Sequence, residues 1–251
     1  MAVAIKSERE IELMRQAGRF LALTHLELEK VIKPGMSTKD VDRIAEETIR
    51  SYGCIPTSLN YNGFPGSACV SLNDEIIHGI PSDKRIIRDG DIVSLDITLS
   101  YKGYQSDAAR TLAVGNVSKE ALQLIEVTKQ SFYEGLKYAK AGNHINDIGK
   151  AVQAYVEQFG YGVVRDFVGH GIGKEMHESP EVPNFDTGRR GMKLKPGMTI
   201  TIEPMINAGR YDVEWMDDDW TIVTADGSLS AHHENTILIT SGEPEILSIL
   251  H

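Results

Sequence analysis

The chain repeats part of itself at a fixed offset of 107 residues. Residues 88–96 (RDGDIVSLD) match residues 195–203 (KPGMTITIE), and each copy ends in a carboxylate on an alternating strand pattern, Asp96 in the first and Glu203 in the second. Such a repeat indicates a duplicated structural unit. We therefore expect a pseudo-two-fold protein that brings acidic side chains together from two halves, which is one way to build a metal centre.

Two further matches occur at the same offset, between residues 33–41 (KPGMSTKDV) and 140–148 (KAGNHINDI), and between the pairs 52–53 and 159–160. Each identity is weak, and two unrelated helix-to-strand connections could look alike. Three matches at one offset favour duplication, so we expect halves of about 1–115 and 116–251 within a single catalytic domain, 1–251.

Length and composition indicate a globular protein in the cytoplasm. A chain of 251 residues can bury about three quarters of its unfolded surface. It has no apolar run of the roughly 20 residues that a membrane span needs, no signal peptide, and only two cysteines. A net charge of −10 argues against a specific nucleic-acid groove, which depends on clustered Lys and Arg.

The pattern of apolar residues predicts an α+β fold, with helices packed on a strongly curved antiparallel sheet. Ser7 and Glu10 form a capping-box signal for the first helix, and Gly53, Gly142 and Gly160 follow the ends of later ones. Each half reads as two helices followed by strands. The predicted helices are 7–31, 37–52, 119–139 and 144–159, and the predicted strands are 92–99, 105–114, 163–168, 199–203, 220–224 and 235–240.

Strand parity places two acids together in the first half. Ser94, Asp96 and Thr98 share one face of their strand, away from the apolar face. A two-residue loop at Tyr101-Lys102 would then put Asp107 opposite Asp96 on the returning strand. Facing carboxylates repel each other unless a proton or a cation lies between them.

The second half repeats the arrangement. Thr199, Thr201 and Glu203 share a strand face, and Glu234 is predicted to be the counterpart of Asp107. That assignment raises the offset to 127, so that twenty extra residues would lie in the second hairpin. A single acid on a strand is ordinarily a solvated side chain, but four at symmetry-related places predict a cation site.

His170 completes the proposed ligand set. It lies in the run 168–173 (VGHGIG), where glycines at every second position leave the backbone bare around a side chain directed at a ligand. A lone histidine is more often a core residue, but this one accompanies four acids. A set rich in oxygen and without thiolate favours Mn(II), Fe(II) or Co(II) over structural zinc. Five such side chains could hold two ions about 3.5 to 4 Å apart.

Several segments resemble type I methionine aminopeptidases of the pita-bread fold. The resemblance covers nearly the whole chain and rests on six motifs, which are NDEIIHGIP (73–81), SLDITLSYKGYQSDAART (94–111), GHGIG (169–173), MHESPEVPN (176–184), TIEPM (201–205) and SAHHENTILIT (230–240). It implies metal-dependent removal of the initiator methionine from nascent polypeptides with a small second residue. The nucleophile would be a water or hydroxide activated by two divalent ions.

By the same resemblance, the five ligands are Asp96, Asp107, His170, Glu203 and Glu234. Glu203 would also move the proton from the water to the leaving amine. His78 and His177 match catalytic histidines that hydrogen-bond the substrate backbone and the tetrahedral intermediate. The methionine pocket would be apolar and soft, with walls from Tyr61, Phe64, Cys69, Met176 and Trp220. Met176 departs from the aromatic residue expected there.

Two alternatives remain open at this point. A proline-specific relative, such as aminopeptidase P or prolidase, usually carries an additional N-terminal domain, for which the roughly 90 residues before Asp96 leave no room. A metal-free binding module of the same fold would have lost ligands that this chain keeps. We expect a monomer that meets its substrates at the ribosome, with no membrane partner. The basic residues around Arg189-Arg190, Lys193 and Lys195 are interpreted as ordinary solvated surface.

Overall fold

The first half of the computed structural model, which describes residues 3–250, consists of two helices followed by antiparallel strands. Its elements are α1 (Glu8–Val31), α2 (Thr38–Ser51), β1 (Ile55–Pro56), a 3-10 turn at Tyr61–Gly63, β2 (Cys69–Leu72), β3 (Glu75–Ile77), β4 (Ile92–Tyr101) and β5 (Tyr104–Ala113). The strands β1, β4 and β2 are neighbours in one sheet, and β5 pairs with β4.

The second half again begins with two helices, but it has more strands. Its elements are α3 (Lys119–Leu136), α4 (Ile145–Val156), a 3-10 turn at Glu157–Phe159, β6 (Gly162–Val163), β7 (Gly169–Gly171), β8 (Glu178–Val182), β9 (Thr199–Ile202), β10 (Met205–Asn207), β11 (Val213–Trp215), β12 (Ile222–Thr224), β13 (Ser230–His232), β14 (Asn235–Leu238) and β15 (Glu245–Ile246). Five strands form a sheet in the order β15-β14-β9-β7-β8.

Each half contains an equivalent backbone contact, and the two contacts are related by the predicted offset of 107. Ser37 forms an isolated antiparallel bridge with Ile86, and His144 forms the same bridge with Lys193. Ser37 and His144 also begin α2 and α4, each within a capping box that satisfies free N–H groups of the first turn. The predicted duplication of the fold is therefore confirmed by the course of the backbone.

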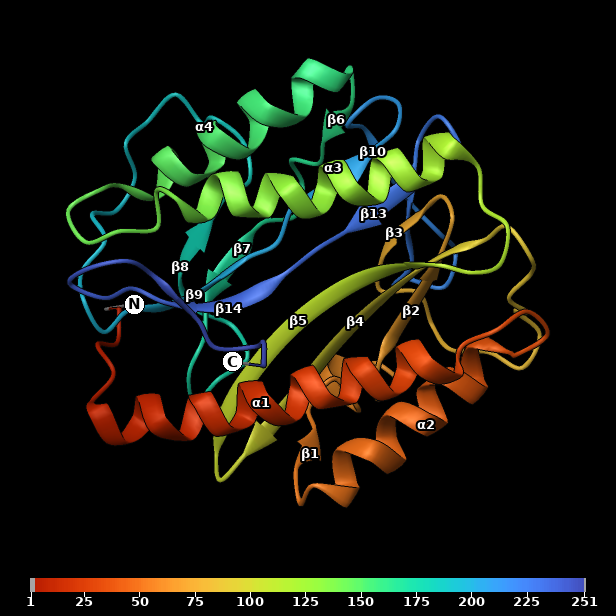
Figure 1. Ribbon diagram of the computed structural model, residues 1–251, viewed down its shortest axis with the longest axis horizontal. Helices are drawn as coiled ribbons and strands as arrows, with labels where there is room; N and C mark the ends of the chain where they lie inside the picture. The colour runs from red at the N-terminus through yellow and green to blue at the C-terminus, as the bar shows by residue number, and fades with distance from the viewer. Residues whose placement is uncertain (1–2, 251) are drawn as a thin grey trace.

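The helices lie outside the strands, one pair on each side of the molecule (Figure 1). Helix α1 packs on β4 and β5 and α2 on β1 and β2, whereas α3 and α4 pack mainly on strands of the second half. Between them β5 and β14 lie side by side, joined by a hydrogen bond from the Glu234 N–H to the Ala109 carbonyl at 3.0 Å. The junction of the two halves therefore runs through the middle of the protein.

The hairpin between β4 and β5 corrects one prediction. The turn residues are Lys102 and Gly103, both with positive φ, rather than Tyr101 and Lys102. Glycine takes this conformation without steric cost, which is why the loop forms one residue later and the pairing shifts by two. Asp107 consequently pairs with Thr98, and Asp96 pairs with Ala109. The two acids still share a face, because a shift of two preserves parity.

The second hairpin corrects the predicted symmetry partner of Asp107. The register of β9 with β14 pairs Ile202 with Asn235. Gly90 N–H donates to the Val114 carbonyl, and Gly197 N–H donates to the Ile239 carbonyl in the same way. By this correspondence the returning strand has an offset of 125, so Glu234 matches Ala109 and the insertion has eighteen residues rather than twenty. Asp107 and Glu234 thus come together without occupying equivalent positions, whereas Asp96 and Glu203 remain equivalent at the offset of 107.

The remaining predicted bounds differ mainly at element ends. The predicted strand 163–168 is wrong except at Val163, which lies in β6. Residues 164–168 are outside any strand, and the chain crosses there from β6, which pairs with β10, to β7, which begins at Gly169 and pairs with β9. The predicted helices 119–139 and 144–159 end as α-helix at Leu136 and Val156, and the strand predicted from Trp220 begins at Ile222. In the described part of the chain, nine short strands were not predicted, namely β1, β2, β3, β7, β8, β10, β11, β13 and β15.

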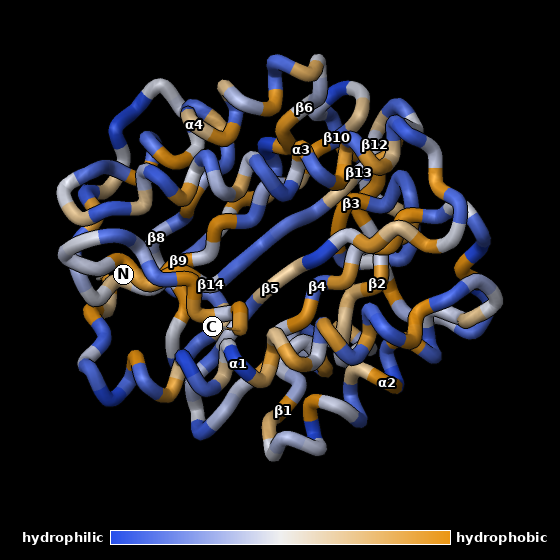
Figure 2. Tube along the Cα trace, in the orientation of Figure 1, coloured by the Kyte–Doolittle hydropathy of each residue, from blue (hydrophilic) through white to orange (hydrophobic). Residues whose placement is uncertain are grey.

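Apolar side chains fill the space between helices and strands. One cluster packs α1 and α2 on β4, with Leu21, Ile49 and Leu95 fully buried, and another packs α3 and α4 on β9. Orange and blue segments alternate along the helices, as expected for helices with one buried face, while the polar run leading into β14 crosses the middle of the molecule (Figure 2). Within residues 3–250, no helix is long and apolar enough to span a membrane.

Candidate metal centre

Five separate strands or strand ends supply the predicted ligands. Asp96 lies on β4 and Asp107 on β5, His170 lies on β7, Glu203 follows β9 and Glu234 precedes β14. The first two come from one half and the other three from the second half. The junction of the halves therefore collects one histidine and four carboxyls, as predicted.

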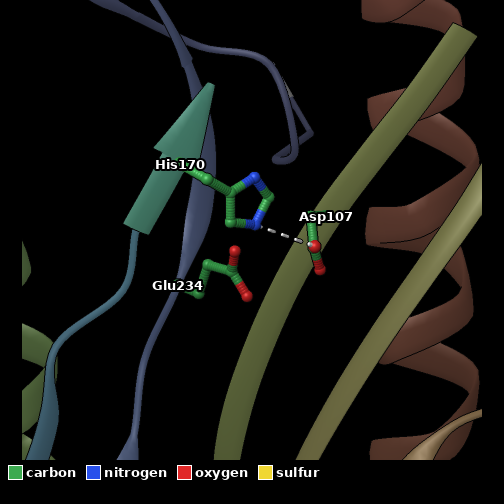
Figure 3. A group of neighbouring side chains, drawn as sticks. All are labelled: Asp107, His170 and Glu234. Carbon is green, nitrogen blue, oxygen red and sulfur yellow. Dashed lines mark ion pairs between the residues drawn. The ribbon is translucent and has the colours of Figure 1, made fainter. Parts of the chain in front are cut away.

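Three of these side chains converge most closely. Ligand atoms of Asp107, His170 and Glu234 all lie within 4.8 Å of one another, and all three residues are buried (Figure 3). The Nε2 atom of His170 is 3.8 Å from Asp107 Oδ2 and 3.6 Å from Glu203 Oε1. Burial raises the pKa of Asp107, and Asp96 adjoins the group closely enough that its negative charge raises this pKa further.

The backbone of β7 fixes the orientation of His170. Its Nδ1 lies 2.9 Å from the Gly171 carbonyl, so Nδ1 carries the proton and Nε2 presents a lone pair to the acids. A Cβ at Gly169 would lie 2.7 Å from the Thr201 carbonyl, and one at Gly171 would lie 2.3 Å from the Ser179 carbonyl. The flanking glycines thus let neighbouring strands approach closely, and this approach carries the imidazole to the acids.

Thr201 connects two of the proposed ligands. Its hydroxyl donates to Glu203 Oε1 at 2.6 Å and accepts the His170 backbone N–H at 2.9 Å. One side chain therefore sets the spacing of the histidine strand and the glutamate. Sequence reasoning placed Thr201 on the ligand face but gave it no role, because a threonine on a strand is not distinctive by itself.

Burial makes the cluster electrostatically unfavourable without a cation. It raises the pKa of Asp96 to about 6 and that of Glu203 to about 8, and it raises the pKa values of Asp107 and Glu234 well above their usual range, with further contributions from neighbouring carboxylates. Within residues 3–250, buried Asp107 Oδ1 and Glu234 Oε1 have no hydrogen-bond partner. These two oxygens fit a divalent metal ion, which would both neutralise and ligate them.

Arg110 is a second feature that the sequence did not reveal. Its guanidinium donates to the carbonyls of Ala109 and Glu234 and to Asn235 Oδ1, the last at 2.6 Å. It thereby ties β5 to the segment that carries Glu234. Burial lowers its pKa to about 10, so it keeps its charge at neutral pH beside the acids.

A cavity of about 230 Å³ adjoins the acids. The two predicted catalytic histidines and all five predicted pocket residues line it together with Asp96 and Asp107. These seven predicted residues are His78, His177, Tyr61, Phe64, Cys69, Met176 and Trp220. This volume lies below the roughly 300 to 1,000 Å³ of sites for drug-sized ligands, and it suits one side chain. Ser58, Asn62 and Thr98 also line it and were not predicted.

His78 is held at the inner end of this cavity by an unusual backbone. It has a positive φ of 59°, which is uncommon outside glycine. The next residue, Gly79, packs so closely on β2 that a Cβ there would lie 2.5 Å from the Val70 carbonyl. Burial lowers the pKa of His78 to about 4, so its imidazole is neutral at pH 7 and can both donate and accept.

His177 lies at the outer rim, near the proposed ligand His170. Its ring centroid is 4.3 Å from that of His170, and its Nδ1 is 2.7 Å from the hydroxyl of Tyr61. Phe64 and Trp220 meet edge-to-face at 5.2 Å between centroids. Cys69 pairs with Asp96 on the adjacent strand, and burial holds the pKa of its thiol well above the usual value. The cavity thus has aromatic and sulfur-bearing walls.

Comparison with known proteins agrees with this arrangement. The profile of metallopeptidase family M24 matches residues 12–241, so the chain belongs to that family, and membership implies a bound divalent metal. A methionine aminopeptidase from Clostridium acetobutylicum is 54% identical over 98% of this chain and 99% of its own length. Methionine aminopeptidase 1 from Bacillus subtilis is 49% identical over 98% of this chain and 99% of its own length.

Solved structures give the same result for the fold. A methionine aminopeptidase from Thermotoga maritima superposes with a TM-score of 0.97 at 40% identity, covering 99% of this chain and all of the other. The prolidase from Pyrococcus horikoshii reaches only 0.77 at 25% identity, and this chain spans 64% of it. The predicted pita-bread α+β fold is confirmed.

Proposed function

We propose that this chain removes N-terminal methionine from polypeptides whose second residue is small, using a water activated at the acid cluster. The observation that carries the proposal is that a cavity sized for one side chain opens directly onto Asp96 and Asp107. A substrate whose first side chain fills the cavity would present its first peptide bond to the acids. The matched methionine aminopeptidases support this choice of side chain.

The proposed metal ligands are Asp96, Asp107, His170, Glu203 and Glu234, which could hold two divalent ions. Oxygen donors with a single imidazole favour Mn(II), Fe(II) or Co(II). When bound, such ions would lower the pKa of a coordinated water toward neutrality and polarise the scissile carbonyl. Cys69 is not among the proposed ligands, because burial keeps it in its thiol form.

Glu203 is the proposed proton shuttle. Its Oε1 accepts the Thr201 hydroxyl proton, which holds the carboxyl in one orientation. A carboxyl whose pKa is raised toward neutrality can take a proton from water and return it to the leaving amine. Orientation and basicity thus favour the same residue.

His78 and His177 are the proposed hydrogen-bond donors to the substrate. His78 lies inside the cavity in its neutral form, and the Tyr61 hydroxyl holds His177 at the rim. Donors placed on either side of the scissile bond would hydrogen-bond the substrate backbone and stabilise the oxyanion of the tetrahedral intermediate. Neither histidine needs to change its charge during the reaction.

The walls of the cavity support specificity for methionine. Phe64, Trp220 and Cys69 surround the space with aromatic and sulfur groups, which suit an unbranched thioether. Met176 is buried in the wall at the position where an aromatic residue was expected. A flexible wall of this kind would adapt to methionine analogues better than a rigid ring would.

Two alternatives make different predictions. A proline-specific peptidase would cleave next to proline, and prolidases superpose on this chain less well. A metal-free binding module would have no use for four buried carboxyls whose pKa values are all raised by burial. We favour the aminopeptidase, acting as a monomer on nascent polypeptides at the ribosome, in the cytoplasm.

A peptide panel tests this function. Metal-depleted protein is incubated with Met-Ala-Ser, Leu-Ala-Ser and Ala-Pro-Ser peptides while Mn(II), Fe(II) or Co(II) is titrated in. We expect cleavage of the methionine peptide alone, and only with metal. Equal cleavage of the leucine peptide would refute the methionine pocket, and inactivity with every ion would support the binding module.

A further inference from the structure

A second cavity, of about 370 Å³, lies behind the candidate metal centre. On β5, Arg110 is three positions from Asp107, so the two side chains emerge on opposite faces of the strand. His233 and Glu234 are consecutive and likewise diverge. Arg110 and His233 line the second cavity, whereas Asp107 lines the cleft. One layer of strands therefore separates the two spaces.

The walls of this cavity are mainly apolar and come from both helix pairs. Leu26 on α1, Ile125 on α3 and Leu112 on β5 contribute to the lining. Leu26 is 39% exposed, so part of the wall remains open to solvent. A cavity of this size accepts a small organic molecule with an apolar body.

The charges around the cavity favour an anion. Arg110 and Lys129 line it, and Glu29 is the single acid among its lining residues. Within residues 3–250, Lys129 has no ion-pair partner. The second cavity is not a candidate metal site. Among the described residues 3–250, the one group of three metal-ligand side chains is Asp107, His170 and Glu234, which lies on the other side of the strands.

Arg110 connects this cavity to the metal side of the strands. Its guanidinium donates to the Glu234 carbonyl and to Asn235 Oδ1, on the segment that positions the Glu234 carboxyl. Its positive charge faces the cavity on one side and repels cations across the strand layer on the other. A group that alters the charge or the hydrogen bonds of Arg110 would act on both sides.

We propose that this cavity is a second ligand site for a small amphiphilic carboxylate, and that Arg110 transmits its occupancy to the metal centre. The carboxylate would lie between Arg110 and Lys129, with the apolar body against Leu26 and Ile125. An anion beside Arg110 offsets its charge, so the anion and the metal ions should favour each other's binding. By linkage, the two effects are equal in size.

Binding is tested with octanoate, using the full chain with its metal. Calorimetry should give a dissociation constant on the order of 1 mM, as ten non-hydrogen atoms allow. Octanol and octylamine have the same chain without a negative charge, and each should bind at least about ten-fold more weakly. Equal affinity for octanol and octanoate would overturn the assignment of an anion site, and octanoate that does not bind would overturn the site itself.

Two variants locate the bound octanoate without disturbing the metal centre. Lys129→Met keeps the side-chain length and removes the charge, and it should weaken octanoate about five-fold, whereas Lys119→Met at the start of α3 should not. Leu26→Trp fills the cavity from a partly exposed position and should abolish binding. If Lys129→Met and Leu26→Trp both bind octanoate as the parent chain does, the octanoate lies elsewhere and the proposal is refuted.

The coupling is tested by metal loss rather than by activity. A chelator in excess removes Mn(II) from the protein, and saturating octanoate should slow this loss about five-fold, at the low end of allosteric couplings. Leu26→Trp at the same octanoate concentration controls for direct chelation by the carboxylate. Octanoate that binds but leaves the rate unchanged would overturn the role of Arg110. Neither test needs peptidase activity, so failure here is distinct from failure of the proposed function.

Discussion

Asp107 and Thr236, one from each half of the chain, are joined by two hydrogen bonds of 2.9 Å. The Asp107 N–H donates to Thr236 Oγ1, and the Thr236 hydroxyl donates to the Asp107 carbonyl. This pair closes the junction at the proposed metal ligand Asp107. The contact therefore contributes both to the stability of the protein and to the position of Asp107 in the site.

Replacing Thr236 should weaken both properties. Thr236→Val keeps the shape but leaves two buried backbone groups of Asp107 unpaired, which should lower the free energy of unfolding by about 1 to 3 kcal/mol and weaken Mn(II) binding. Thr236→Ser keeps the hydroxyl and should restore most of both. Urea unfolding and metal titration measure the two effects. If valine lowers neither, the junction does not position Asp107.

Glu203→Gln should separate metal binding from proton transfer. The amide can still accept the Thr201 hydroxyl and can ligate through its oxygen, but it cannot take a proton from water. We expect kcat to fall about 100- to 10,000-fold, the range for loss of a general base. Metal content, measured by emission spectroscopy, should stay above half. A variant that retains metal and has an unchanged kcat would show that Glu203 is not the proton shuttle.

His78→Ala and His177→Ala should each lower kcat/KM by roughly 30- to 1,000-fold, equivalent to about 2 to 4 kcal/mol of transition-state stabilisation. Tyr61→Phe removes only the hydroxyl that contacts His177 Nδ1, so its loss should be smaller, about ten-fold or less. Steady-state kinetics on a Met-Ala-Ser peptide compares the three variants. A larger loss for Tyr61→Phe than for His177→Ala would contradict the assigned order.

Without metal, the protein should be less stable at high pH. The pKa of Glu203 is about 8 in the folded chain, against a usual 4.5, so the folded state holds its proton more tightly. This contribution is complete below about pH 4.5 and is lost as the pH rises through 8. The free energy of unfolding of chelated protein should fall by about 3 kcal/mol from pH 6 to pH 9.

Two comparisons isolate the cause of that pH effect. Glu203→Gln cannot ionise at this position and should show a smaller fall between the same pH values. Saturating Mn(II) should remove most of the dependence, since the carboxylates are then held ionised by the metal. A chelated parent chain that is equally stable at pH 6 and pH 9 would show that the acids do not carry the burial cost described above.

The sequence predicted the fold and the identity of the clustered residues because both leave patterns that can be read along the chain. Duplication appears as a constant offset, and a polar residue on an otherwise apolar strand, such as Asp96, shows its face by parity alone. The predicted register of β5 against β4 was wrong, because this register depends on whether Lys102 takes a positive φ, which is a property of the folded hairpin.

Supporting residues could not be found in this way. Thr201, Arg110 and Thr236 act through contacts with residues far away in the chain, and threonine or arginine on a strand is common without such a role. The symmetry partner of Asp107 was misassigned for a related reason, since an insertion of eighteen residues interrupts the repeat between β9 and β14. Only the backbone pairing of β9 with β14 shows how this insertion shifts the correspondence between the two hairpins.

The most direct test of the account is a crystal of this protein grown with Mn(II), with data collected for anomalous scattering. We predict anomalous peaks enclosed by the carboxyls of Asp96, Asp107, Glu203 and Glu234 and by Nε2 of His170. Five side chains surrounding solvent alone, or Mn(II) bound only outside this group, would contradict it.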